Sequence, residues 1–109
     1  MIVTSRVDKH LLILIKDSVI MNDDALYEEV GNAISGSEIR RVKIDMGEME
    51  RIDDHGVDIL YRLIQKFTQR GYNIRIQHPN LYLLKLLVVK GLIDKINIDY
   101  EPSELQKYS

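Results

Sequence analysis

Apolar and polar residues along this chain fall into short periodic segments, which predict alternating strands and helices. A short β-rich run, Ile2 to Val7, is separated by Asp8-Lys9 from a continuous apolar run, Leu11 to Ile15. A continuous apolar run is typical of a strand that is buried on both faces. The two runs together predict a β-hairpin or two adjacent strands.

Three later segments carry apolar residues at the spacing of an amphipathic helix. The first follows the cap-type residues 22–24 and ends at 35–37, the second follows Asp53 and Asp54, and the third follows a turn at 78–80. The second and third end at Gly71 and Gly91, where glycine suits a left-handed terminal position. The predicted apolar stripes are Leu26, Val30, Ala33 and Ile34; Val57, Leu60, Leu63, Ile64 and Phe67; and Leu81, Leu84, Leu87 and Val88.

Strand-like alternation follows each of these helices, at residues 42–46, 73–77 and 96–100. The element order is therefore β-β-α-β-α-β-α-β, which predicts an α/β fold with a mixed, mostly parallel sheet and one antiparallel pair. The chain reads as one domain over residues 1–100, followed by a polar C-terminal tail at 101–109.

The third helix has more apolar residues than one buried face requires. Leu83, Leu86 and Val89 lie off its predicted stripe. Two interpretations stay open: a helix wedged into the core, or a helix with a second apolar face for a partner.

Composition narrows the function classes. The chain has 109 residues, 45% hydrophobic and 29% charged, with a formal net charge of −2 and no cysteine. The absence of cysteine excludes disulfides and thiolate metal sites, and the lack of a basic surplus disfavours nucleic acid as a ligand. No apolar run approaches the ~20 residues of a membrane span, so we expect a cytoplasmic protein without membrane insertion.

The segment ERIDDHGVD, residues 50–58, is the candidate site for chemistry. Asp53, Asp54 and His55 are consecutive, so they cannot all point to one metal ion without a special turn. The chain also lacks a nucleophile-elbow motif and a phosphate-binding glycine loop. We therefore expect no metal, no cofactor and no catalytic residue.

The same segment resembles the central motif of STAS domains, the family of anti-sigma factor antagonists. That family has a strand ending in Asp, an apolar residue, and Asp-Ser-Ser-Gly opening a helix that ends in Gly before the next strand. A Gly-Leu segment precedes its last strand. The matching positions are Asp45, Ile52, Asp53, Gly56, Gly71 and Gly91-Leu92.

The sequence departs from the family pattern at the serine that is phosphorylated in antagonists of this family. The serine before the motif glycine, which is phosphorylated in antagonists of this family, is replaced by His55, and the preceding serine by Asp54. Asp54 is an N-cap candidate, and Gly56 would let a partner backbone approach. A plain exposed histidine is the simplest interpretation of His55, with pH sensing or phosphoryl acceptance as a variant.

The resemblance implies a non-enzymatic interaction module that binds an anti-sigma factor or related serine kinase in partner switching. Such a module is expected to be a monomer or dimer. The alternative is a fixed STAS subunit of a larger assembly, such as a stress-signalling scaffold or a lipid-transporter complex. The predicted partner-binding residues are Asp53, Asp54, His55, Gly56, Asp58, Tyr61 and Arg62.

Overall fold

The computed structural model describes residues 2–19, 23–36 and 38–99, which form one α/β unit. The tail predicted at 101–109 lies outside the described residues. The elements are β1 (Ile2–Val7), β2 (His10–Ile15), β3 (Asp17–Val19), α1 (Asp23–Ser35), β4 (Arg41–Asp45), β5 (Met49–Ile52), α2 (Asp54–Gln69), β6 (Asn73–Gln77), α3 (Leu81–Val89) and β7 (Asn97–Ile98).

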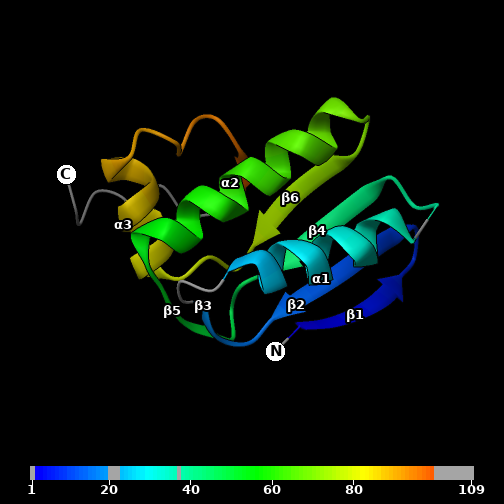
Figure 1. Ribbon diagram of the computed structural model, residues 1–109, viewed down its shortest axis with the longest axis horizontal. Helices are drawn as coiled ribbons and strands as arrows, with labels where there is room; N and C mark the ends of the chain where they lie inside the picture. Colours follow the sequence, from blue (N-terminus) through cyan, green and yellow to red (C-terminus); the bar gives the residue numbers. More distant parts are fainter. Residues whose placement is uncertain (1, 20–22, 37, 100–109) are drawn as a thin grey trace.

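The main sheet has five strands in the order β1-β2-β4-β6-β7. Strands β1 and β2 form an antiparallel hairpin, and the pairs β2-β4, β4-β6 and β6-β7 are all parallel. Figure 1 shows this sheet with the hairpin at one edge. The predicted fold class, a mixed and mostly parallel sheet with three helices, is confirmed.

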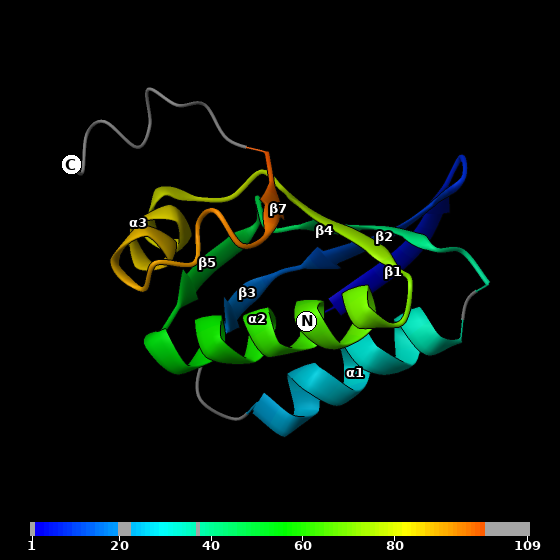
Figure 2. The same ribbon diagram turned by 90° about the horizontal axis from the view of Figure 1, so that it is seen from above.

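The core lies between the main sheet and the two long helices. Figure 2 shows α1 and α2 along the same face of the sheet. Three isoleucines from neighbouring strands, Ile13, Ile44 and Ile76, stand in register at the centre of this face, and each is 0% exposed. Leu63 and Phe67 of α2 belong to the same buried cluster, so the apolar stripe of α2 supplies the second wall of the core.

The other face of the hairpin corrects one prediction. Leu12 and Leu14 are only half-buried, so β2 alternates between buried and partly exposed positions. The expectation that the run Leu11–Ile15 is buried on both faces is wrong, because the helices α1 and α2 cover only one face of the sheet.

A second sheet, missed by the sequence pattern, joins β3 and β5 in parallel. Strand β5 has buried residues at its two ends, Met49 and Ile52, and exposed ones between them. That spacing of three does not alternate, which explains why periodicity did not reveal it. The strand matters because it leads directly into α2 and packs beside α3.

Helix α3 also differs from its predicted stripe. Its buried residues are Leu83, Leu84 and Leu87, whereas Leu81 and Val88 are each 39% exposed. The helix therefore does insert one side into the core: Leu84 and Leu87 are buried as predicted, but Leu83 is buried in place of Leu81 and Val88. The last strand is shorter than expected: it comprises Asn97–Ile98, and Tyr100 lies outside the described residues.

Candidate functional site

The start of α2 is fixed by Asp53. This residue has extended backbone angles, φ −93° and ψ 175°, and its Oδ1 accepts a hydrogen bond of 2.7 Å from the Gly56 backbone N–H. It is the N-cap of the helix, which satisfies one of the free backbone donors at a helix start. The prediction that Asp54 caps the helix is therefore corrected: Asp54 is the first helical residue.

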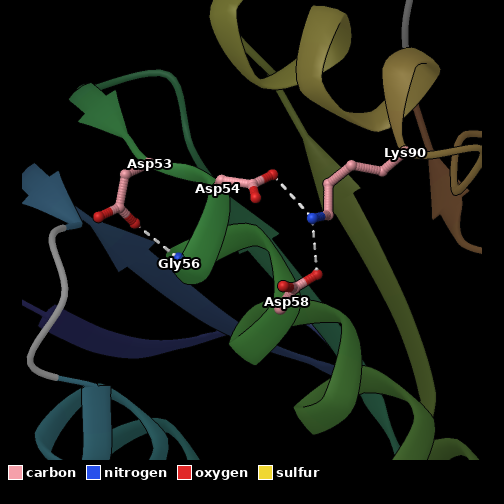
Figure 3. Close-up of polar contacts among 5 residues, drawn as sticks. All are labelled: Asp53, Asp54, Gly56, Asp58 and Lys90. Atoms are coloured by element: carbon pink, nitrogen blue, oxygen red, sulfur yellow. Dashed lines mark hydrogen bonds and ion pairs between the residues drawn. The ribbon is translucent and has the colours of Figure 1, made fainter.

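Asp54 and Asp58 lie one turn apart on α2 and share a single cation. The Nζ of Lys90, the residue after α3, is 2.7 Å from Oδ1 of Asp54 and 3.0 Å from Oδ1 of Asp58 (Figure 3). The hydrogen bonds to Asp54 and then to Asp58 raise the pKa of Lys90 above its ordinary value. The cation also joins the end of α3 to the start of α2, across 36 residues of sequence.

Lys90 was not among the residues predicted for this site. The sequence places it only at the end of a helix, and nothing in the local pattern shows that this end packs against the start of α2. Its side chain is 19% exposed, against 71% for Asp54, so the lysine lies beneath the carboxylate that it binds. Because one ammonium group balances two carboxylates, the trio carries a net charge of −1 rather than −2.

The other motif residues divide into exposed and internal positions. His55 is exposed in the first turn of α2, whereas Gly56 is buried, with its backbone N–H already bonded to Asp53. Further along the helix, Arg62 is exposed. Tyr61 is half-buried, and its hydroxyl accepts a hydrogen bond of 2.9 Å from Gln65 Nε2.

A surface groove of about 320 Å³ opens beside this helix start. One wall is the end of β5 and the start of α2, with Arg51, Ile52, Asp53 and Asp54, and the other is α3, with Tyr82 and Leu86. Tyr82 is 56% exposed. The groove thus has an apolar lining from Ile52, Tyr82 and Leu86 and a rim that carries both signs of charge.

Asn80 joins the two walls of this groove. Its Oδ1 accepts from the Leu83 backbone N–H at 2.8 Å and caps α3, while its Nδ2 donates to the Met49 carbonyl of β5 at 2.9 Å. One side-chain amide therefore sets both the start of α3 and its position relative to β5.

Asp45, at the end of β4, has a local role. Its Oδ1 accepts a hydrogen bond of 2.9 Å from the Gly47 N–H, and its Oδ2 lies 3.2 Å from Nδ1 of His78. His78 has a positive φ of 51°, a conformation that few residues other than glycine adopt. Asp45 therefore holds the turns that follow β4 and β6, as strand-end aspartates commonly do.

No group of three or more His, Asp or Glu side chains within residues 2–19, 23–36 and 38–99 is arranged to hold a metal ion. Over the same part of the chain, no helix is long and apolar enough to cross a membrane.

Comparison with known proteins identifies the family. The model of the STAS domain matches residues 4–105. The chain belongs to the STAS family. No curated protein matches the sequence.

Solved structures share this STAS fold at low sequence identity. A candidate anti-sigma factor antagonist of Thermotoga maritima has a TM-score of 0.79 at 15% identity, covering 97% of this chain and 92% of its own. An anti-sigma factor antagonist of Mycobacterium paratuberculosis has the same TM-score and identity, covering 98% and 92%. A chain from the stressosome, a signal integration and transduction hub, has a TM-score of 0.70 at 18% identity, covering 95% and 93%.

Proposed function

We propose that this STAS domain is a non-enzymatic protein-interaction module that binds an anti-sigma factor or a related serine kinase in a partner-switching pathway. Family membership and the likeness to anti-sigma factor antagonists support this class of partner. The single observation that carries the proposal is the groove between the start of α2 and α3, because it places an apolar lining next to the exposed end of the motif.

The docking surface is the groove together with the exposed side of α2. Asp54 and His55 form its near rim, and Asp58, Tyr61 and Arg62 continue it along the helix. A central apolar contact surrounded by charged residues is the usual anatomy of a protein interface. Asp53 and Gly56, both predicted to bind the partner, would act from within by holding the helix start in place.

This surface would stay in one charge state. No serine or threonine occurs between Glu38 and Phe67, and the resemblance to the family motif matches His55 to the phosphoacceptor serine. Phosphorylation would add about −1.5 to −2 charges at that point. Here Lys90 already balances one of the two nearby carboxylate charges. The net charge at this helix start therefore lies between that of an uncharged serine motif and that of a phosphorylated one.

The pairing with Lys90 determines how the surface should be tested. Reversing Asp54 and Asp58 to lysine would break the link between α2 and α3, so lost binding could not be assigned to the surface alone. Arg62→Glu and Tyr82→Lys instead change exposed positions on the two sides of the site. Lys9→Glu, in the β1-β2 hairpin, and Thr68→Lys, in the last turn of α2, introduce the same charge changes elsewhere on the exposed surface.

The experiment is capture from lysate of the native organism, identification by mass spectrometry, and titration calorimetry with the purified captured protein. We expect an anti-sigma factor or kinase-like protein that binds wild type and both controls. Arg62→Glu and Tyr82→Lys should each weaken it about tenfold or more, as at interface hot spots. A partner of another class, or equal affinity for all variants, would contradict the proposal.

A fixed subunit of a larger assembly is the second candidate. The likeness to a stressosome chain and the exposed apolar residues of α3, Val88 at 39% and Val89 at 75%, favour it. Gel filtration of native lysate separates the two functions. A fixed subunit elutes with a large particle, and a switching module elutes as a monomer, a dimer or a small complex.

A further inference from the structure

Strand β1 forms one edge of the main sheet. Strand β1 is the first in the sheet order and pairs with β2 along its full length, from Ile2↔Ile15 to Val7↔His10. No strand of the described chain pairs with its other side. Residues 3–7 are all exposed, so both faces of the strand are open as well.

An edge of this kind normally carries a device that prevents pairing with other strands, such as charged side chains, a proline, a bulge or a very short length. The pairing of β1 with β2 is continuous over six residue pairs, the strand contains no proline, and Arg6 is its one charged residue. Its two valines, Val3 and Val7, are 42% and 50% exposed. The edge is therefore suited to pairing, and its exposed valines would gain from being covered.

The sequence of β1 is self-complementary in one antiparallel register. If two copies pair about a two-fold axis at Ser5, Val3 of each copy lies opposite Val7 of the other, and Thr4 lies opposite Arg6. Residues opposite one another in an antiparallel pair share a face, so both valine pairs form on the face that carries Leu12 and Leu14. No like charges stand directly opposite each other.

The neighbouring registers are poorer. Moving the axis to Thr4 places Val3 opposite Ser5 and Ile2 opposite Arg6, so the two exposed valines no longer pair with each other. Moving it to Arg6 sets the two Arg6 side chains directly against each other, which is destabilising. The register centred on Ser5 is the one that pairs both exposed valines and opposes no charge.

We propose that β1 pairs with β1 of a second copy of this chain in that register, which joins the two main sheets into one continuous sheet. One strand offers less than the ~800 Å² per partner of a standard interface, so we expect a reversible dimer rather than an obligate one. The start of α2 and α3, which line the groove, lie at the opposite end of the molecule from β1 (Figure 1), so the groove stays free in both copies. The dimer and the proposed partner binding can thus fail independently.

The absence of cysteine allows a direct test of the register. Ser5→Cys places the two new thiols opposite each other across the axis, within ~4.5–5.5 Å between Cβ atoms. Val7→Cys is the matched control, because residue 7 is also exposed but its two copies lie about 13 Å apart along the strands. Thr4→Cys reports the competing register.

Under mild oxidation, we expect Ser5→Cys to form disulfide-linked dimers at least tenfold faster than Val7→Cys and Thr4→Cys. Sedimentation velocity of the wild type should show a concentration-dependent dimer, weakened by Val3→Lys/Val7→Lys, which sets lysine against lysine. In Val3→Lys/Val7→Glu the opposed charges are complementary, so the dimer should persist. Equal cross-linking rates, faster linking of Thr4→Cys, or a wild type that stays monomeric up to millimolar concentration would overturn the proposal.

Discussion

The Nζ of Lys90 lies 2.7 Å from Oδ1 of Asp54, and this contact connects the residue that caps the end of α3 to the first residue of α2. Asp58, one turn along α2, binds the same nitrogen at 3.0 Å. The negative charge of Asp54 and Asp58 is therefore partly neutralised by Lys90. Any account of binding at this surface must include a lysine that the motif itself does not contain.

Replacing Lys90 by methionine should lower the melting temperature, because it leaves Asp54 and Asp58 as neighbouring carboxylates without their cation. The loss should be smaller than that of a core truncation and should shrink in 1 M salt, where the Debye length is ~3 Å. Thermal melts of both proteins at low and high salt measure it. A difference unaffected by salt would show that Lys90 acts through packing instead.

The Lys90 contribution should also depend on pH. Folding raises the pKa of Lys90 above its ordinary value of 10.5, so the folded state holds this proton more tightly than the unfolded state. The stabilisation is then fully present below about pH 10.5 and is lost as the pH rises through the folded-state pKa. Urea unfolding of wild type and Lys90→Met from pH 8 upward should show the two stabilities converging at the alkaline end.

Asp53 and Asp54 are adjacent acids with different roles, and alanine variants should separate them. Asp53→Ala removes the N-cap of α2 and should reduce the free energy of unfolding by about 1 kcal/mol, within ~0.5–2. Asp54→Ala leaves the cap intact and leaves Lys90 bound to Asp58, so its cost should be smaller. Chemical denaturation of both variants checks this order, and the reverse order would return the cap to Asp54.

Asn80 should be more sensitive than its partly buried position suggests. Asn80→Ala removes both the cap of α3 and the bond to the Met49 carbonyl, for a loss of about 2 kcal/mol. Asn80→Ser is the matched control, because serine can cap the helix but cannot reach across to β5. We expect it to restore about half of the loss in urea unfolding. Full restoration would mean that the bond to β5 contributes nothing.

Helix α3 can be tested by two truncations in one element. Leu87 is 1% exposed and Val89 is 75% exposed. Leu87→Ala should cost about 2–5 kcal/mol through the cavity that it leaves, whereas Val89→Ala should stay within about 0.5 kcal/mol. Denaturant unfolding gives both values. Similar losses would mean that Val89 is as well packed as Leu87, which would contradict the burial described for α3.

The fold was predictable because most of its elements follow simple periodicities. The stripe of α2 and the alternation of β4 and β6 each put one face of their element into the core, and those faces are buried as expected. Positive φ angles at Gly71 and Gly91 confirm the two predicted helix ends. Prediction failed for the elements whose apolar residues do not follow a helix or strand periodicity. Helix α3 is apolar except for Lys85 and Tyr82, so its sequence does not say which side is buried, and the short β5 has no alternation.

The candidate site was predictable only in part, for a related reason. The spacing of Asp53 and Gly56 identifies a helix start from local chemistry alone. Lys90 and Asn80 reach it from 31 or more residues away in sequence, and a contact of that kind depends on how α2, α3 and β5 pack together. Local pattern carries no information about such packing, so half of the site emerges only in three dimensions.

The two hydrogen bonds made by the side chain of Asn80 have a consequence for partner affinity. Because the two walls of the groove are held at a set separation before any partner arrives, the groove is preorganised. A ligand entering it would not spend part of its interaction energy on ordering the receptor. Changes at Asn80 should therefore act mainly on the entropy of association, although this residue does not line the groove itself.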